Sequence, residues 1–138
     1  MYLLDTNVIS EFRKSSDGRM NKGVQRWAEG IFPELMFLSV ISVLELEIGV
    51  LKIERRDKKQ GVILRKWLNK NVLPTFSERV LPVDLAVAQR CASLHVPNPK
   101  SERDAMIAAT AIEYRMTIVT RNVSDFSKSG VKVFDPWI

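Results

Sequence analysis

The sequence contains one cysteine, Cys91, and one histidine, His95, among its 138 residues. A single cysteine cannot form a disulfide within the chain, nor can it supply a set of thiolate metal ligands, and this usage is typical of a reducing compartment. One histidine leaves a Ser-His-Asp triad dependent on a single helix-end residue, and no such triad stands out. These scarcities exclude a disulfide-stabilised scaffold and a thiolate zinc site.

Long apolar runs and glycine-rich loops are also missing. The apolar start of the chain is interrupted by Asp5 and Glu11, too early for a signal peptide, and no stretch approaches the roughly 18 apolar residues of a membrane span. None of the 6 glycines falls in a P-loop pattern, which argues against ordinary nucleoside-triphosphate hydrolysis. We expect a cytoplasmic protein that makes no membrane contact.

What the chain does contain is an ordinary globular composition with an excess of positive charge. Charged residues make up 27% and apolar residues 46% of the chain, and its length suits a single domain over residues 1–138. The formal net charge is +5 and the pI is near 9.6. This balance favours anionic partners, of which nucleic acid is the commonest.

Short apolar segments alternate with helical patterns along the whole chain. The predicted strands cover residues 2–4, 36–40, 80–83, 117–120 and 131–134, and the predicted helices cover 8–14, 22–30, 43–53, 58–72, 85–94 and 102–115. Polar, turn-rich loops are expected at 15–21 and 96–101. Continuous apolar strands alternating with helices predict a mostly parallel sheet between two helical layers, a three-layer α/β/α sandwich.

Four carboxylates map to the carboxyl edge of this predicted sheet. Asp5 follows the first strand, Glu45 lies in the first turn of the helix after the second, Asp104 starts the alanine-rich helix, and Asp125 follows the fourth strand. Ligand sites in open α/β sheets form beyond the carboxyl ends of the strands. We therefore expect these four side chains to converge on one site.

Each of these acids also has a purely structural interpretation. Ser42 with Glu45, and Ser101 with Asp104, resemble capping boxes, while Asp5 and Asp125 suit Asx-type turns. Two further acids that follow strands are assigned structural roles only. Asp84 is expected to cap a helix, and Asp135, before Pro136, is expected to stabilise a turn. The structural interpretation is weaker for four acids together, because clustered carboxylates repel one another unless a cation compensates them.

Carboxylate oxygens are hard ligands suited to Mg²⁺, and also to Mn²⁺. A metal held by such acids equips a site for phosphodiester cleavage by activated water. Setting the four acids aside leaves 21 basic against 12 acidic residues, so the predicted acidic site lies on a basic body. That distribution fits a nuclease, because the surface attracts phosphate and the acids hold the metal.

Four motifs, in order and spacing, resemble those of the PIN-domain ribonucleases. They are "LLDTN", the "SVLELEIGVL" helix, the "DAMIAATA" helix and the "TRNVSDF" turn, and together they span nearly the whole chain. Within that family, "DTNVISEFRK", "VLPVD" and the closing "DPW" look like the VapC toxins of the FitB-like branch. The resemblance implies Mg²⁺-dependent RNA cleavage by a toxin that a small cognate antitoxin inhibits, and it suggests a homodimer.

Site residues carry over from the resemblance by position. Asp5, Glu45 and Asp104 match the family's acidic triad, and Asp125 matches its more variable fourth acid, a role for which Asn122 competes. Asp5, Asp104 and Asp125 are the expected metal ligands, with Glu45 as ligand or base. Neighbouring polar residues, expected to orient ligands or water, are Thr6, Asn7, Thr120 and Asn122, and candidates for holding RNA phosphates are Arg13, Lys14 and Arg121.

Two alternative functions remain at this stage. The chain could act by binding alone, as the nucleic-acid-binding part of a toxin–antitoxin repressor complex on DNA with little or no turnover. A phosphotransfer domain of the receiver or dehalogenase type also places an aspartate after its first strand. The dehalogenase pattern needs a second acid where this chain has Asn7, and the receiver pattern needs paired acids at the start of the chain and a lysine after the last strand, both of which are missing.

Overall fold

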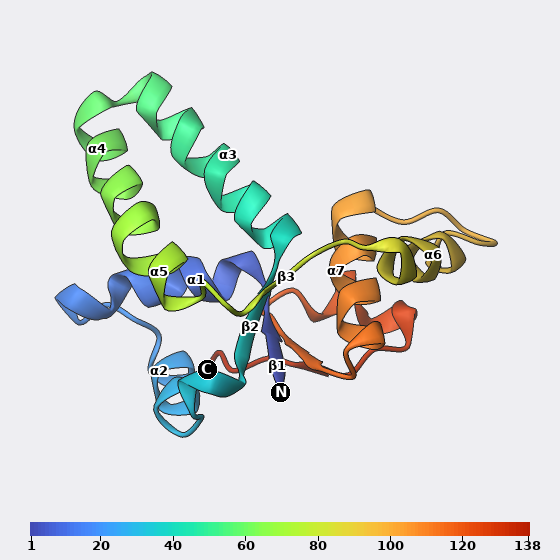
Figure 1. Ribbon diagram of the computed structural model, residues 1–138. Coiled ribbons are helices and arrows are strands. Elements are labelled where there is room, and N and C mark those ends of the chain that lie inside the picture. The colour runs from blue at the N-terminus through green and yellow to red at the C-terminus, as the bar shows by residue number, and fades with distance from the viewer.

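Five short strands form one fully parallel sheet through the centre of the molecule (Figure 1). The computed structural model describes residues 1–138, and its strands are β1 (Tyr2–Leu4), β2 (Met36–Ser39), β3 (Val80–Leu81), β4 (Thr117–Val119) and β5 (Val133–Phe134). Their order across the sheet is β3-β2-β1-β4-β5, so the first strand of the chain is the central one. Leu3 of β1 lies level with Phe37 of β2 and with Ile118 of β4.

Helices cover both faces of the sheet. The α-helices are α1 (Thr6–Phe12), α2 (Lys22–Glu29), α3 (Val40–Arg56), α4 (Lys58–Trp67), α5 (Leu73–Thr75), α6 (Leu85–Leu94) and α7 (Glu102–Glu113). A π-helical segment, η3 (Leu68–Val72), joins α4 to α5, and short 3₁₀ turns are η1 (Arg13–Asp17), η2 (Pro33–Leu35), η4 (Val123–Asp125) and η5 (Ser127–Ser129). In Figure 1, α3 and α4 form a long hairpin on one side, and α6 and α7 lie together on the other. None of these helices is both long and apolar enough to cross a membrane.

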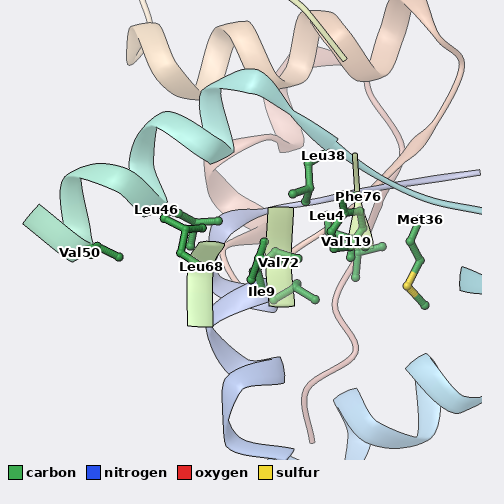
Figure 2. Packing of buried hydrophobic residues seen from close by; sticks show 11 residues of the cluster. Leu4, Ile9, Met36, Leu38, Leu46, Val50, Leu68, Val72, Phe76 and Val119 are labelled. Atoms are coloured by element: carbon green, nitrogen blue, oxygen red, sulfur yellow. The ribbon is translucent and has the colours of Figure 1, made fainter. Parts of the chain in front are cut away.

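The core around the sheet divides into two parts because neighbouring residues of β1 face opposite sides, and a third, smaller cluster lies between α6 and α7. Leu4 packs with residues of α1, α3 and η3, in the cluster drawn in Figure 2, where Ile9, Leu46 and Val72 converge beneath the strands. Leu3 packs on the other side with Ile107 and other residues of α7. This arrangement confirms the predicted three-layer α/β/α sandwich.

Polar caps turn three strands into helices at the same edge of the sheet. The Asp5 carboxylate accepts a hydrogen bond from the Thr6 N–H at 2.8 Å and begins α1. The Ser39 hydroxyl accepts one from the Ile41 N–H at 3.0 Å and begins α3, and the Asp84 carboxylate accepts one from Val87 and begins α6, as the sequence predicted. Such caps satisfy N–H groups that the first helical turn leaves without partners.

Several predicted boundaries were wrong by a few residues. The Ser39 cap starts α3 at Val40, so the second strand is shorter and the helix longer than predicted. The predicted helix 58–72 changes to π geometry at Leu68, and residues 15–17 of the predicted loop belong to a 3₁₀ turn. The last long helix ends at Glu113 rather than residue 115, because Arg115 adopts a left-handed φ of 55° that an α-helix does not allow.

Candidate active site

One open hollow of about 540 Å³ collects the four carboxylates that the sequence singled out. They arrive from four separate elements: the end of β1, the first half of α3, the first turn of α7, and η4. The complete lining is Asp5, Thr6, Asn7, Ser10, Glu11, Arg13, Lys14, Glu45, Asp104, Arg121, Asn122, Asp125 and Trp137. The hollow lies where β1 and β4 end, which is where the parallel topology predicts a site.

Asp5 is the most deeply buried of the four acids, with 7% of its surface exposed. Its main-chain N–H donates to the Val119 carbonyl at 2.9 Å, which continues the pairing of β1 with β4 to the edge of the hollow. One carboxylate oxygen accepts from Thr6 N–H, and the other accepts from the Thr120 hydroxyl at 2.7 Å. Burial raises the pKa of Asp5, the bonds from Thr120 and Thr6 oppose that shift, and the charges of Glu45 and Asp125 add to it, so that the net shift is upward.

Glu45 is fixed by contacts with two other elements. The Thr6 hydroxyl donates to Glu45 Oε1 at 2.7 Å, and the Arg103 guanidinium lies 3.6 Å from Glu45 Oε2. Ser42 does not cap this helix as the capping-box interpretation required: Ser39 is the cap, and the Ser42 hydroxyl is buried with no hydrogen-bond partner. Glu45 therefore points to partners across the hollow rather than back to its own helix end.

Asp104 carries the largest electrostatic perturbation in the hollow. Burial raises its pKa first, and the charges of Asp125, Asp5 and Glu45 raise it further, to about 6. A hydrogen bond with the Ser101 side chain opposes this upward shift in part, but Ser101 makes no side-chain capping bond to α7, so the predicted capping box is incomplete. Asp125 is exposed in η4, and its charge acts on both Asp5 and Asp104, which places it in electrostatic contact with the other acids.

The chemistry of this donor set fits a divalent cation. Of the four acids, only Glu45 has a basic side chain within 4.0 Å, so most of the negative charge is uncompensated by the protein itself. No three carboxylate, imidazole or thiol groups form a ready-made ligand set. Mg²⁺ commonly takes only one or two carboxylates and keeps several waters. A bound cation would relieve the mutual repulsion that raises the pKa of Asp104.

Polar neighbours hold the acids in place through a short network. The Asn7 amide donates to Asp5 at 3.4 Å and to the Thr120 hydroxyl at 3.3 Å, while its oxygen accepts from the Arg121 N–H at 3.3 Å. The Asn122 N–H donates to the Thr120 hydroxyl at 3.0 Å. Thr120 does not line the hollow but supports Asp5 from behind, whereas Asn122 contributes both to this network and to the lining.

The three basic residues expected near the site all line the hollow, but they differ in how they are held. Lys14 forms an ion pair with Glu11 at 3.0 Å. Arg13 and Arg121 are exposed and have no carboxylate partner within 4.0 Å. Lys14 is therefore tied to the protein, and the two arginines are available to an anionic ligand.

Sequence reasoning missed three lining residues: Ser10, Glu11 and Trp137. Ser10 and Glu11 lie three and four residues after Asn7, so the helical period alone places them on the same face of α1 as Asn7. Glu11 is buried, with 8% of its surface exposed, and its second oxygen accepts from the Asn21 N–H at 2.8 Å. No local signal in the sequence marks Trp137 as a neighbour of Asp5.

A three-layer sandwich with an acidic hollow at the carboxyl edge of a parallel sheet defines the class of protein: an α/β domain with a carboxylate-rich candidate site. The family model described as the PIN domain matches residues 2–130. The chain belongs to the PIN-domain family.

Similar proteins extend over the full chain. The toxin FitB of Neisseria gonorrhoeae is 36% identical over 142 residues, with 99% of each chain covered. The VapC ribonuclease Y4jK of Sinorhizobium fredii is 34% identical, with 99% of this chain and 98% of that protein covered. The solved structure of FitAB bound to the IR36 DNA fragment matches with a TM-score of 0.88 at 34% identity, covering 100% of this chain and 96% of that one.

Proposed function

We propose that this protein is a Mg²⁺-dependent endoribonuclease and the toxin of a type II toxin–antitoxin pair. The observation that carries the proposal is the hollow in which Asp5, Glu45, Asp104 and Asp125 meet, where burial first and then the charges of the other three acids raise the pKa of Asp104. Similarity to a toxin and to a VapC ribonuclease over the whole chain supports the same proposal.

Each acid has a role in the proposed reaction. Asp5, Asp104 and Asp125 hold Mg²⁺, or Mn²⁺ in its place, and Glu45 serves as a further ligand or as the base that accepts the proton from the attacking water. When bound, the cation supplies activation of water and stabilisation of charge at the scissile phosphate. Thr6 fixes Glu45, and Thr120 with Asn7 fixes Asp5, so both carboxylates are oriented before the substrate arrives. The amide of Asn122 lines the hollow beside Asp125 and is the competing candidate for the fourth role.

The residues proposed to bind phosphate are the basic residues that line the hollow: Arg13, Lys14 and Arg121. Arg13 and Arg121 have no carboxylate partner within 4.0 Å, while Lys14 is paired with Glu11. We expect the two arginines to attract the RNA backbone, and Lys14 to act mainly through Glu11.

RNA cleavage by the purified protein tests this proposal directly. We expect cleavage of single-stranded RNA in Mg²⁺, loss of cleavage in EDTA, and loss in the Asp5→Asn, Asp104→Asn double variant. Full activity of the double variant would rule the proposal out. A Glu102→Gln variant is the matched control, since Glu102 is an exposed acid in the first turn of the same helix as Asp104 but does not line the hollow.

A binding role on DNA is the second candidate, because a similar protein is solved as FitAB bound to a DNA fragment. We expect this chain to reach DNA through a small cognate antitoxin and to form a homodimer. Salt-dependent RNA binding without turnover in Mg²⁺ or Mn²⁺ would favour binding alone. Sedimentation of the chain by itself, and then with the product of a neighbouring small gene, measures both assemblies.

A further inference from the structure

Trp137 is the one apolar side chain in the lining of the acidic hollow. The guanidinium carbon of Arg121 lies 5.7 Å from the centre of its ring. The face of an indole attracts a cation held at this distance, and Trp is the strongest of the aromatic residues in this respect. Arg121 is therefore held against an aromatic surface at the rim of the site.

Arg121, which contacts the indole of Trp137, has no ion pair with a carboxylate. Five acids line the hollow. The charge of Arg121 helps to lower the pKa of Glu11, yet no carboxylate lies within 4.0 Å of the Arg121 guanidinium, whereas Arg103 reaches Glu45 at 3.6 Å. The Arg121 main chain is also fixed, since its N–H donates to Asn7 at 3.3 Å. Arg121 is thus anchored at its backbone and supported at its guanidinium, with its charge left available.

The tail that carries Trp137 is seated on the protein by specific contacts. The main-chain N–H of Trp137 donates to Asp135 Oδ1 at 2.9 Å, which is the turn role that the sequence predicted for Asp135. The Asn21 side-chain amide donates to the main-chain oxygen of Ile138 at 2.9 Å. A side chain at Gly23 would collide with the main-chain oxygen of Pro136, so α2 approaches the tail closely there. The C-terminus accordingly lies beside α2 in Figure 1.

We propose that Trp137 is a positioning residue that holds Arg121 ready to bind a backbone phosphate of single-stranded RNA beside the scissile one. The guanidinium is a planar fork whose N–H donors match two phosphate oxygens, and contact with the ring restricts the orientations that this fork can adopt. This inference rests on the proposed function for its substrate. It goes beyond that function by selecting Arg121 over Lys14 as the phosphate contact and by giving Trp137 a role.

The salt dependence of RNA binding tests the proposal without relying on cleavage. A fluorescein-labelled single-stranded RNA of random sequence is titrated with protein in an Asp104→Asn background over a series of KCl concentrations. Loss of one phosphate contact reduces the slope of log affinity against log salt by about 0.7 for a single strand. We expect Arg121→Gln to produce that reduction and to weaken binding about tenfold at low salt. We expect Trp137→Leu to reproduce most of both effects, and Trp137→Phe, which keeps an aromatic face, to retain wild-type binding.

A double variant and a distant control sharpen the result. If Trp137 acts through Arg121, the Arg121→Gln, Trp137→Leu double variant binds no more weakly than Arg121→Gln alone. Lys128→Gln removes an exposed charge outside the hollow and should leave the slope unchanged. An unchanged slope in Trp137→Leu, additive losses in the double variant, or an equal loss in Lys128→Gln would each overturn the proposal.

Other readouts separate this proposal from the proposed function. In the otherwise wild-type chain, Trp137→Leu should raise KM for RNA while kcat is retained, because the acids are untouched. Absence of Mg²⁺-dependent cleavage would refute the nuclease proposal and leave the salt slopes standing. If thermal unfolding shows that Trp137→Leu does not fold, Arg121→Lys replaces it, since a lysine lacks the planar fork and should lose the affinity that Trp137→Phe keeps.

Discussion

The Thr6 hydroxyl donates to Glu45 Oε1 at 2.7 Å and joins the start of α1 to α3 across 39 residues of sequence. Glu45 has one other polar partner, the more distant Arg103 at 3.6 Å. Thr6 therefore sets the direction of a carboxylate that the proposed reaction uses as ligand or base, and the contact gives the first of four predictions.

Replacing Thr6 by valine should lower RNA cleavage far more than it lowers stability. Valine keeps the shape of threonine but cannot donate to Glu45, and loss of such an orienting bond typically reduces activity about tenfold to a hundredfold. Thr6→Ser keeps the hydroxyl and is the control. Steady-state cleavage of an RNA oligonucleotide, with thermal unfolding in parallel, measures both effects. Wild-type kcat in Thr6→Val would show that Glu45 needs no such orientation.

Asp104→Asn should abolish cleavage yet raise the melting temperature in EDTA. The pKa of Asp104 is raised to about 6 by burial and then by Asp125, Asp5 and Glu45. A raised pKa means that the folded state disfavours the charged form, so Asp104 destabilises the fold at pH values above about 6, and this cost shrinks as the pH falls toward the unfolded value of about 3.9. We expect a gain of roughly 2–5 °C at pH 8 that diminishes by pH 4.5.

Glu102→Gln is the control for this stability change, because Glu102 is exposed two residues away on the same helix. Its melting temperature should stay near that of the wild type at both pH values. Adding Mg²⁺ should stabilise the wild type and not Asp104→Asn. A lower melting temperature for Asp104→Asn at pH 8 would contradict the electrostatic account of the hollow.

Cleavage by the wild type should decline as the pH falls through about 6, where Asp104 takes up a proton. Metal binding requires ionised carboxylates and therefore competes with protons. Raising the Mg²⁺ concentration should move the midpoint of the decline to lower pH. Values of kcat/KM between pH 4.5 and 8 at two Mg²⁺ concentrations measure this, and a midpoint that does not respond to Mg²⁺ would separate the titration from metal binding.

Glu11→Gln should destabilise the fold at neutral pH. Burial alone would raise the pKa of Glu11, but the Asn21 N–H and Lys14 outweigh burial and lower it. A lowered pKa contributes stability that is present above the unfolded value and is lost as the pH falls through the folded one. We expect a loss of about 1–2 kcal/mol at pH 7, since charge-assisted bonds are replaced by neutral ones. This difference should shrink in acid, below the normal pKa of a glutamate.

Glu29→Gln is the control for Glu11→Gln, because Glu29 is exposed on α2 and bonds only the side chain of Gln25. Urea unfolding at pH 7 and again in acid measures both variants. Equal losses in the two variants would show that the burial and the partners of Glu11 contribute nothing.

The positions of Asp5 and Asp125 could be predicted from where the apolar strands end and from the parallel order of those strands. A buried apolar strand that ends in a polar turn fixes where its next residue lies, and parallel strands bring such residues to one edge. The π geometry at Leu68 has no comparable signal, since its apolar spacing continues that of α4. The burial of Glu11 depends on the N–H of Asn21, ten residues away, and the place of Trp137 depends on how the tail crosses α2. Contacts of this kind are decided by tertiary packing.

Capping residues produced the main ambiguity in interpreting the sequence. Ser39 and Ser42 both precede apolar helical residues, and only the structure shows that Ser39 caps α3. Asp5 can serve both as a helix cap and as a site residue. One carboxylate oxygen accepts the Thr6 N–H that begins α1, and the other accepts a hydrogen bond from the Thr120 hydroxyl at the hollow.

The central position of β1 also determines when the hollow comes into existence. On one side β1 pairs with β2 soon after it is made, but on the other side Tyr2 to Leu4 pair with Thr117 to Val119, made more than a hundred residues later. Asp125, the last of the four acids, follows still later in the chain. Contacts this distant in sequence form slowly, and domains generally fold as units during synthesis. A ribosome making this protein must therefore synthesise nearly the entire chain before the four acids can meet in one hollow.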